Sequence, residues 1–468
     1  MTARPSRLFL PLLLAGTALL TGCAHGDYGT TTSPVTPQAA WQRADASVAS
    51  TPWPAADWWG GFGSAELLTL LGDARAANPD LAAAAARLAQ ADARARAAGA
   101  ALLPTLGASA GLSRQESDAS GPGGRSGRTS SSLGLSAAYE LDFWGANRAA
   151  ADSAAAGVVI SRLDQETVAL TVTAGVANGY FQVLSLRDRV RSAEESLALA
   201  ERVMAVVDAR YRNGAATALE VAQQRNALVS QQAALPALRQ QEVAALNSLA
   251  VLLGRAPADL SVSGTGLGGL GLPATGVGVP ADLLERRPDL KAAAVQLEAA
   301  GADIVAARAA LYPAATLNLS GTLTGAGLSS LVDAPGAVAS LGLSLAQSLF
   351  DGGRRRAQVE VAQARRVELV ETYRKAILTG FSDVETALAQ ARNTESQRRF
   401  QEEAVRLSRE LFRLAETRYR EGAVDLLTLL DAQRSLLSAQ DQLTQVRLAE
   451  MQTAIALFRA LGGGWSAA

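Results

Sequence analysis

The side chains best suited to nucleophilic or metal chemistry are almost missing from this chain. Its 468 residues include one cysteine, Cys23, and one histidine, His25, both near the N-terminus. A zinc site needs about three or four cysteine, histidine or carboxylate ligands, and a serine or cysteine nucleophile needs a well-placed histidine. A disulfide within one chain needs two cysteines. The sequence therefore predicts neither a catalytic site nor a metal site, and we expect no enzyme.

A glycine pattern and the net charge bear on nucleotide and nucleic-acid binding. Gly264, Gly266 and Gly269 match G-x-G-x-x-G, which binds a dinucleotide only where it joins a strand to a helix. More glycine and proline follow as far as Pro280, so we predict a linker there and no nucleotide site. The formal net charge is −1, without the basic excess typical of nucleic-acid binding. We therefore expect no nucleic-acid partner.

The single cysteine follows a segment typical of secretory signals. Residues 1–22 carry two arginines and then an apolar stretch that is too short to span a bilayer comfortably. The stretch ends in Leu20-Thr21-Gly22-Cys23, which resembles a bacterial lipobox. This resemblance implies cleavage before Cys23 and acyl chains on its thiol and amine, which would anchor the protein stably in a membrane. Apart from this covalent lipid we expect no cofactor.

The residues after the cysteine read as a tether. Ala24 takes the place of the aspartate that directs such lipoproteins to the inner membrane, so the resemblance implies the outer membrane. The following residues are rich in serine, threonine, proline and alanine, a composition typical of a linker. His25 lies in this tether, and we expect no specific role for it.

Landmark residues recur along the chain at a nearly constant offset of 208 or 209. The repeated landmarks are Asn78-Pro79-Asp80-Leu81 with Arg287-Pro288-Asp289-Leu290, Pro104 with Pro313, Arg210-Tyr211-Arg212-Asn213-Gly214 with Arg418-Tyr419-Arg420-Glu421-Gly422, and Leu253-Gly254 with Leu461-Gly462. Because four landmarks keep the same spacing, we interpret the mature chain as a duplicated unit.

Each half is predicted to fold in the same order. A Pro-Asp pair opens a helix, and a later proline ends it. Two strands of about 9–13 residues follow, with leucine at alternate positions, and in the first half a polar loop at about 115–130 joins them. A long helix (147–210 or 354–418) then leads to a glycine turn and a return helix of about 37 residues. Two shorter helices laid end to end would match the length of one long helix.

The long helix of the first half carries a coiled-coil pattern. Apolar residues recur every seven positions, at Val176, Val183, Val190, Leu197, Met204 and Tyr211. This spacing predicts a buried seam along the helix. In the first return helix, Pro236 should produce a kink.

These elements divide the chain into six predicted segments. They are a lipoprotein signal (1–22), a lipidated tether and equatorial segment (23–60), a first repeat (61–255) with a β-hairpin at 104–143, an equatorial linker (256–285), a second repeat (286–464) with a β-hairpin at 313–350, and a C-terminal tail (465–468).

The alternating strands indicate a transmembrane β-barrel more than a soluble sandwich. They lack the aromatic and β-branched bulk of a packed core. Aromatic residues instead gather at the strand ends, where a membrane-interface girdle would lie: Tyr139, Phe143, Trp144, Tyr312 and Phe350. Four strands cannot close a barrel, since the smallest such barrels have eight, and lipid does not tolerate open sheet edges. The chain should therefore oligomerise, and three copies would supply twelve strands.

The chain resembles the TolC superfamily of outer-membrane efflux proteins, closest to its OprM/NodT lipoprotein branch. The residues that carry the resemblance are the lipobox, both Pro-Asp-Leu helix starts, Tyr-Glu-Leu-Asp-Phe-Trp-Gly at 139–145, Leu-Phe-Asp-Gly-Gly at 349–353, Arg418-Tyr419-Arg420-Glu421-Gly422 followed by Leu427-Thr428-Leu429-Leu430-Asp431-Ala432-Gln433-Arg434, and Ala460-Leu461-Gly462-Gly463-Gly464-Trp465. This family implies a mainly α fold with a membrane β-barrel. It forms a homotrimer with a 12-stranded outer-membrane barrel, four strands per chain, continued by a 12-helix periplasmic α-barrel with an equatorial domain.

The resemblance also implies partners and a function. The expected partners are outer-membrane lipid, a periplasmic adaptor (membrane fusion) protein and an inner-membrane RND pump. The expected function is the exit duct of a tripartite efflux system for drugs, metals or other small toxic compounds. An exit duct for type I protein secretion uses the same fold and remains the alternative. A coiled-coil envelope lipoprotein without a pore would leave the strands and the duplication unexplained.

Two sets of site residues follow from the resemblance. A periplasmic gate maps to Leu427, Asp431 and Arg434 on the last helix, with Tyr419 just before its turn. On spacing alone, Asp431 and Arg434 could equally be an ordinary surface pair three residues apart. Adaptor-docking helix tips map to Gly214, Ala215, Gly422 and Ala423, where glycine would also serve as ordinary helix-end chemistry.

Overall fold

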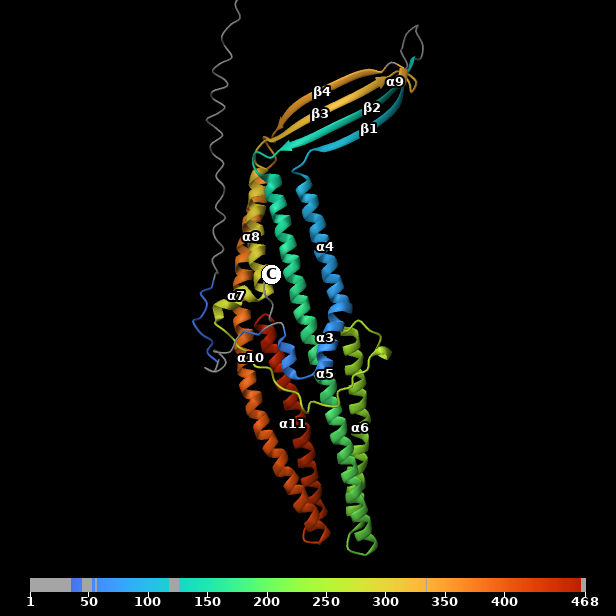
Figure 1. Cartoon of the computed structure of the whole chain (residues 1–468), viewed down its shortest axis with the longest axis vertical. Coiled ribbons are helices and arrows are strands. Elements are labelled where there is room, and N and C mark those ends of the chain that lie inside the picture. The colour runs from blue at the N-terminus through green and yellow to red at the C-terminus, as the bar shows by residue number, and fades with distance from the viewer. Residues whose placement is uncertain (1–34, 44–52, 55–56, 118–125, 334, 464–468) are drawn as a thin grey trace, which may run out of the picture. The chain divides into compact units, whose positions relative to one another are not determined.

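The computed structural model describes residues 35–43, 53–54, 57–117, 126–333 and 335–463. The main elements, labelled in Figure 1, are α3 (Ala65–Ala77), α4 (Pro79–Ala100), β1 (Thr105–Ser117), β2 (Ser126–Leu141), α5 (Ala146–Arg212), α6 (Ala218–Leu252), α7 (Leu283–Arg286), α8 (Pro288–Ala309), β3 (Ala314–Gly325), α9 (Ser330–Asp333), β4 (Gly336–Ala346), α10 (Arg354–Arg420) and α11 (Leu426–Ala460). Short 3₁₀ turns at Trp58–Phe62, Pro257–Asp259 and Pro280–Asp282 complete them.

The predicted order of helices and strands is confirmed in both halves. The helix α6 runs through Pro236 without a break. The residues from 264 to 271 form a loop, as the linker prediction requires. The signal segment 1–22, Cys23, His25 and the tail 465–468 lie outside the described residues, and the six predicted segment boundaries remain a prediction.

The chain divides into two compact units. Among the described residues, unit 1 comprises 89–160 and 294–372 and contains the four strands. Unit 2 comprises the described parts of 35–88, 161–293 and 373–463 and contains both hairpins of long helices and return helices. We describe each unit by itself.

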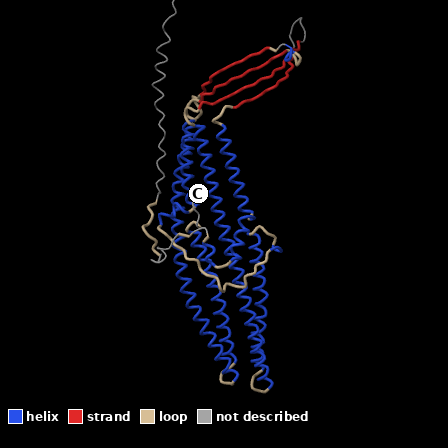
Figure 2. The backbone as a smooth tube through the Cα atoms, viewed as in Figure 1, coloured by secondary structure: helices blue, strands red, loops and turns tan. Residues whose placement is uncertain are grey.

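In unit 1 the strands form one antiparallel sheet in the order β1-β2-β3-β4 (Figure 2). The register aligns the leucines of neighbouring strands, for example Leu133 with Leu323 and Leu319 with Leu341. Since side chains alternate between the two faces of a strand, these leucines share one face, and they are exposed in the single chain. The opposite face carries serine, threonine, glycine and asparagine, as in the register of Ser320 with Ser340.

The strands of the first hairpin extend further into its loop than the sequence pattern predicted. The polar loop expected at about 115–130 is partly strand, because β1 continues to Ser117 and β2 starts at Ser126. At 16 residues, β2 exceeds the predicted range of 9–13. Backbone pairing needs no apolar side chains, and here the hydroxyls of Ser113 and Ser130 hydrogen-bond across the strands at 2.7 Å. The second hairpin is shorter than predicted, since β4 ends at Ala346, before Leu349.

Aromatic side chains lie at the strand ends of unit 1. The rings of Trp144 and Tyr312 stack with centroids 4.6 Å apart, and the Trp144 indole donates to the carbonyl of Pro313 at 2.8 Å. Both rings remain about half exposed, and Phe350 is almost fully exposed. An amphipathic ring with a satisfied polar group suits an interface between lipid and water, as the predicted girdle requires.

Within unit 2 the start of each shorter helix meets the end of a return helix, as the predicted end-to-end arrangement requires. The amide of Asn78, at the start of α4, donates to the carbonyl of Leu252 at the end of α6 at 2.7 Å. In the second half, Arg287 before α8 donates to Ala460 at the end of α11 at 3.3 Å. Leu252 and Ala460 are 208 residues apart, so the two halves repeat the same junction.

A glycine allows each junction to close. Gly254 (φ +65°) and Gly462 (φ +93°) follow the return helices in the left-handed region, where glycine is preferred. A Cβ on Gly254 would overlap the carbonyl oxygen of Ala77, and one on Gly462 would overlap that of Arg286. Glycine therefore recurs after leucine in both halves because the backbone at the end of each return helix packs directly against the backbone before the next shorter helix.

The linker between the halves lies against α5 in unit 2. The carboxylate of Asp188 accepts from the N–H of Leu267 at 2.8 Å, and Arg187 donates to the carbonyls of Val262 (2.8 Å) and Gly264. A Cβ on Gly266 would overlap the Asp188 carboxylate. The G-x-G-x-x-G pattern thus reflects close packing of the linker on a helix.

Glu66 of α3 also holds the linker. Its carboxylate accepts from the N–H of Gly264 at 2.9 Å, from the hydroxyl of Ser263 at 2.9 Å and from the hydroxyl of Tyr180 at 3.0 Å. Burial raises the pKa of Glu66, but the hydrogen bonds from Ser263, Gly264 and Tyr180 outweigh it and lower the pKa below its usual 4.5. The ionised carboxylate is therefore the form that fixes the linker.

We expect acid or Glu66→Gln to release this part of the linker. A lowered pKa in the folded state stabilises the fold above the ordinary pKa of 4.5, and this contribution is lost as the pH falls through the lowered value. At neutral pH, Glu66→Gln should speed proteolysis near Ser263 about tenfold, because losing charged hydrogen bonds costs about 1.5 kcal/mol of local stability. Limited proteolysis with mapped cleavage sites measures this, and equal rates in both proteins would contradict it.

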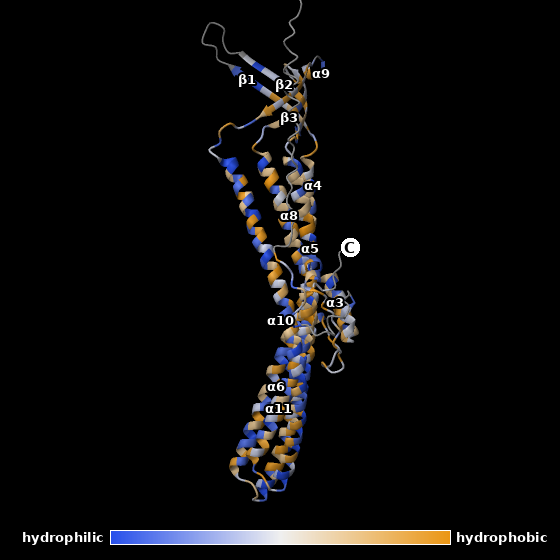
Figure 3. Cartoon of the chain, turned by 90° about the vertical axis from the view of Figure 1, so that its left-hand side faces the viewer, coloured by the Kyte–Doolittle hydropathy of each residue, from blue (hydrophilic) through white to orange (hydrophobic). Residues whose placement is uncertain are grey.

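Below the linker, unit 2 is a single layer of four helices. Figure 1 shows α11 and α5 in the middle of this layer, with α10 and α6 at its two edges, and Figure 3 shows the layer edge-on. A cluster of buried residues joins the middle helices to α10, and includes Val203, Val207, Phe412, Leu426 and Leu430. No helix within the described residues is both long and apolar enough to cross a membrane.

Candidate functional site

The three predicted gate residues of α11 lie together on its exposed face. The Asp425 side chain caps the helix by accepting from the N–H of Thr428 at 2.9 Å, which fixes where α11 begins. Leu429 and Leu436 are buried on the opposite face of the helix. Successive residues turn by about 100°, so Leu427, Asp431 and Arg434 fall within one narrow arc.

Asp431 and Arg434 contact each other only loosely within one chain. Their closest atoms are 3.5 Å apart, and both side chains are more than 70% exposed, at 74% and 72%. An exposed pair of this kind contributes only about 0.2–0.5 kcal/mol to a helix. Both groups therefore remain available to other charges.

Tyr419 does not share that exposed face. It is 1% exposed and belongs to the cluster that joins α10 with α11 and α5. Arg210, at the end of α5, lies 4.6 Å above the ring and also donates to the carbonyl of Tyr419. Burial raises the pKa of the Tyr419 phenol, and the nearby carboxylate of Glu220 raises it further. In the single chain, Tyr419 therefore links two helix ends and is not a surface group.

The predicted docking tips are the turns that join each long helix to its return helix. Gly214 (φ +72°) and Gly422 (φ +77°) take the left-handed conformation that ends a helix. The N–H groups of Ala215 and Ala423 donate back to the carbonyls of Arg210 and Arg418, both at 2.8 Å. The two turns are equivalent in structure. Their residues have short side chains, so little protrudes from the turns.

A groove opens beside the first turn. Its volume is about 430 Å³, and it lies between the end of α5 and Arg420 of α10. Its lining residues are Ala205, Val206, Ala209, Arg210, Asn213, Ala215 and Arg420. The lining combines small apolar side chains with guanidinium and amide groups, a mixture that suits a partner helix carrying acceptor groups.

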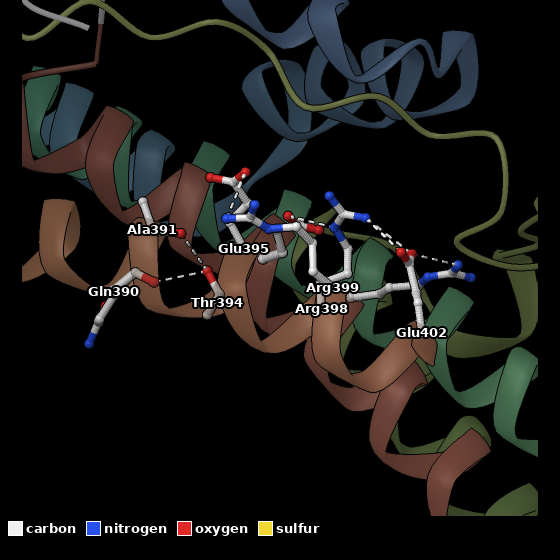
Figure 4. Close-up of polar contacts among 9 residues, drawn as sticks. Gln390, Ala391, Thr394, Glu395, Arg398, Arg399 and Glu402 are labelled. Atoms are coloured by element: carbon white, nitrogen blue, oxygen red, sulfur yellow. Dashed lines mark hydrogen bonds and ion pairs between the residues drawn. The ribbon is translucent and has the colours of Figure 1, made fainter. Parts of the chain in front are cut away.

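Charged pairs join each long helix to its return helix, and they repeat between the halves. Glu194 pairs with Arg239 at 2.8 Å, and 208 residues later Glu402 pairs with Arg447 at 3.4 Å. Arg398 adds a second bond to Glu402 at 3.1 Å (Figure 4). This contact with Arg398 lowers the pKa of Glu402. The repeated pairs fix the register of both helix hairpins and so place their tips.

Sequence reasoning missed two residues near the tips. Arg210 links the two hairpins through Tyr419, and its recurrence as Arg418 at an offset of 208 was the available signal. Gln433 of α11 is buried, and neither polar atom of its amide has a hydrogen-bond partner among the described residues. An unsatisfied buried amide costs about 1–3 kcal/mol, so the packing beneath the gate residues is weakly stabilised.

Comparison with known proteins identifies the family. The model of the outer membrane efflux protein family matches residues 70–255 and 279–463, which is most of the chain. The chain belongs to the outer membrane efflux protein family. The pyoverdine export outer membrane protein OpmQ of Pseudomonas putida is 42% identical over 440 residues, covering 92% of this chain and 93% of that protein. The toluene efflux pump outer membrane protein TtgC of Pseudomonas putida is 32% identical over 470 residues, covering 97% and 95%.

Solved structures of outer-membrane channels share the fold of this family member. The outer-membrane channel OprN superposes with a TM-score of 0.83 at 28% identity, covering 93% of this chain and 99% of that one. The protein is accordingly an outer-membrane efflux channel component of the TolC-like fold, with a helical periplasmic part and four strands per chain. Its family comprises transport channels rather than enzymes.

Proposed function

We propose that this efflux protein acts as a homotrimer and forms the passive exit duct of a tripartite RND-type efflux system. The observation that carries the proposal is the sheet of unit 1. Its leucine face is exposed, and among the described residues its outer strands β1 and β4 each have a strand partner on one side only. Three such sheets joined edge to edge give a twelve-stranded barrel with leucine toward lipid and small polar side chains toward water.

A gate at the helix tips closes the proposed duct at rest. In a trimer, Leu427, Asp431 and Arg434 each form a ring of three on the exposed face of α11. Carboxylates and guanidinium groups in adjacent rings can hold the tips together through charge-assisted hydrogen bonds. Tyr419 contributes from behind this ring by fixing the neighbouring helix ends through Arg210.

The turns at Gly214–Ala215 and Gly422–Ala423 receive the periplasmic adaptor, which couples the duct to the inner-membrane pump. The groove beside Ala215 supports this assignment, since it lies next to the first turn and is lined by both small apolar and polar side chains. Acyl chains on Cys23 add a second attachment to the outer membrane, as the lipobox resemblance implies.

Filling the groove should abolish efflux without unfolding the channel. In Ala205→Trp the indole occupies the space that an adaptor helix needs, so we expect efflux to fall at least tenfold while the trimer still assembles. The matched control is Ala234→Trp, which changes an exposed alanine of α6 that does not line the groove. Export rate and adaptor cross-linking measure the effect. Normal adaptor cross-linking in Ala205→Trp would contradict the docking role.

For the cargo we propose a secreted siderophore-like small molecule. The relative at 42% identity is named for pyoverdine export, whereas the relative at 32% is named for toluene efflux. A deletion strain should therefore retain siderophore in the periplasm, and the gene supplied in trans should restore export. Sensitivity to antibiotics, dyes, metals and solvents is measured in the same strain. Unchanged siderophore export with a large gain in drug or solvent sensitivity would assign the other cargo class.

A further inference from the structure

A second groove of unit 2 lies between α10 and α11, away from the helix tips. Its volume is about 510 Å³, which is in the range of sites for small molecules. Phe400 and Val446 give it apolar surface, and four of its lining side chains are amides. These amides belong to Gln397, Gln401, Gln442 and Gln445. None of the described residues that line the groove carries a charge, so the groove suits a neutral ligand.

The protein itself orients three of these amides. Gln401 donates to the carbonyl of Ala439 at 3.0 Å, and Gln445 donates to the carboxylate of Asp441 at 2.6 Å. Gln442 donates to a serine hydroxyl one turn earlier at 3.1 Å. A carbonyl or a carboxylate only accepts, so it must face the nitrogen of the amide. Within the part of the chain that the structure describes, no donor reaches the three amide oxygens, which therefore remain free to accept from a ligand.

The pairing of the two helices does not require these glutamines. The helices α5 and α6 form the same hairpin in the first repeat and have the same lengths as α10 and α11. At the offset of 208, the counterparts of Gln442 and Gln445 are Ala234 and Ala237. Since the first hairpin forms with alanine at these positions, the amides of the second hairpin are available for another role.

The groove shares the exposed stripe of α11 with the proposed gate. Exposed residues recur there every three or four positions, a spacing that keeps them on one side of a helix. They are Leu427, Asp431, Arg434, Ser438, Gln442 and Gln445. Gln445 follows Leu427 by five helical turns, or about 27 Å. In the proposed duct this stripe faces the interior, so three grooves, one from each copy, surround the path of the cargo.

We propose that this groove binds the cargo on the wall of the duct, and that the cargo is a neutral molecule with several N–H or O–H donors beside an apolar group. This inference rests on the proposed exit duct and names the chemistry of what passes through it. The donors meet the free oxygens of Gln401, Gln442 and Gln445, and the apolar group lies on Phe400 and Val446. The binding is weak, because a duct conducts only if its cargo can also leave.

A peptide probe tests the groove in the intact protein. The probe is an N-acetylated tripeptide amide of serine, leucine and serine, and saturation-transfer NMR measures its binding to the full-length protein in detergent. We expect Gln442→Ala with Gln445→Ala to raise the dissociation constant about tenfold, because two hydrogen bonds to the probe are lost. This double variant carries the alanines of the first repeat, so we expect it to fold, and its melting temperature checks this.

Two other glutamines of α10 provide the matched control. Gln358 and Gln363 are exposed, and neither lines the groove. Gln358→Ala with Gln363→Ala should leave the dissociation constant unchanged. A second control keeps the protein and changes the probe. The same peptide with methylated backbone nitrogens has lost its backbone donors, so we expect the unchanged protein to bind it about fivefold more weakly.

The outcomes separate the groove from the duct. Equal dissociation constants for the Gln442 and Gln445 variant and its control would overturn the inference, and so would a lack of binding to the unchanged protein. Conductance of the reconstituted protein in a planar bilayer tests the duct independently. A conducting protein that fails the binding test keeps its proposed function and loses only this site. A protein that binds the probe without conducting fails as a duct.

Discussion

Replacing Asp431 and Arg434 together by alanine should raise the single-channel conductance of the reconstituted protein severalfold. In the proposed gate each side chain occurs three times around a narrow opening, so the double change removes six charged groups that hold the helix tips together. The loose contact of 3.5 Å within one chain predicts almost no loss of stability from the same change. Planar-bilayer recording gives the conductance, and thermal unfolding gives the stability.

A similar pair elsewhere on the helices serves as the control. Glu403 and Arg406 of α10 are also three residues apart and exposed, and their side chains approach to 2.6 Å. Glu403→Ala with Arg406→Ala should leave the conductance unchanged. If the Asp431 and Arg434 variant behaves like this control, the two residues are an ordinary surface pair.

Gly254→Ala should destabilise the protein by about 2–5 kcal/mol, since the left-handed backbone costs alanine about 1–2 kcal/mol and forced overlap about 1–3 kcal/mol more. The new Cβ would overlap the carbonyl of Ala77 and push the end of α6 away from the start of α4. Gly462→Ala should act in the same way on α11 and α8. The melting temperature of the purified protein in detergent measures both effects.

Gly63→Ala separates the two causes. Gly63 has a φ of +73°, and a Cβ there would meet no atom within 4 Å. It should therefore show only the backbone cost of about 1–2 kcal/mol. Equal losses for Gly63→Ala and Gly254→Ala would mean that the helix ends do not press against each other as the structure describes.

Much of the fold could be predicted because its signals are local. Proline or glycine marks most of the helix ends, although α6 continues through Pro236, and the alternating leucines of β1–β4 indicate which face of the sheet is apolar. Because the sequence repeats, each of these signals occurs once in each half and can be checked against its counterpart. The stacking of α4 on α6 could also be foreseen, because the lengths of the helices left few other arrangements.

The rest depends on contacts that one sequence does not encode locally. Nothing in the residues around Ser117 and Ser126 distinguishes strand from loop, because their pairing is decided by the opposite strand. Tyr211 and Tyr419 occupy equivalent positions in the two repeats. Only Tyr419 is buried, because Arg210 of the other repeat lies over its ring. The gate residues likewise came from family resemblance, since Asp431 and Arg434 three residues apart look like any surface pair.

The exposed leucine face of unit 1 also governs how the protein reaches its working state. A newly made chain carries an apolar sheet surface and, within the part that the structure describes, strand edges at β1 and β4 without a neighbour; both features promote aggregation in water. We expect such a chain to need a holding chaperone during its passage to the membrane, and in the proposed trimer its folding is completed only when copies meet. In that assembly the stability depends on protomer concentration, so an unfolding midpoint measured at low protein concentration reports dissociation as well as unfolding.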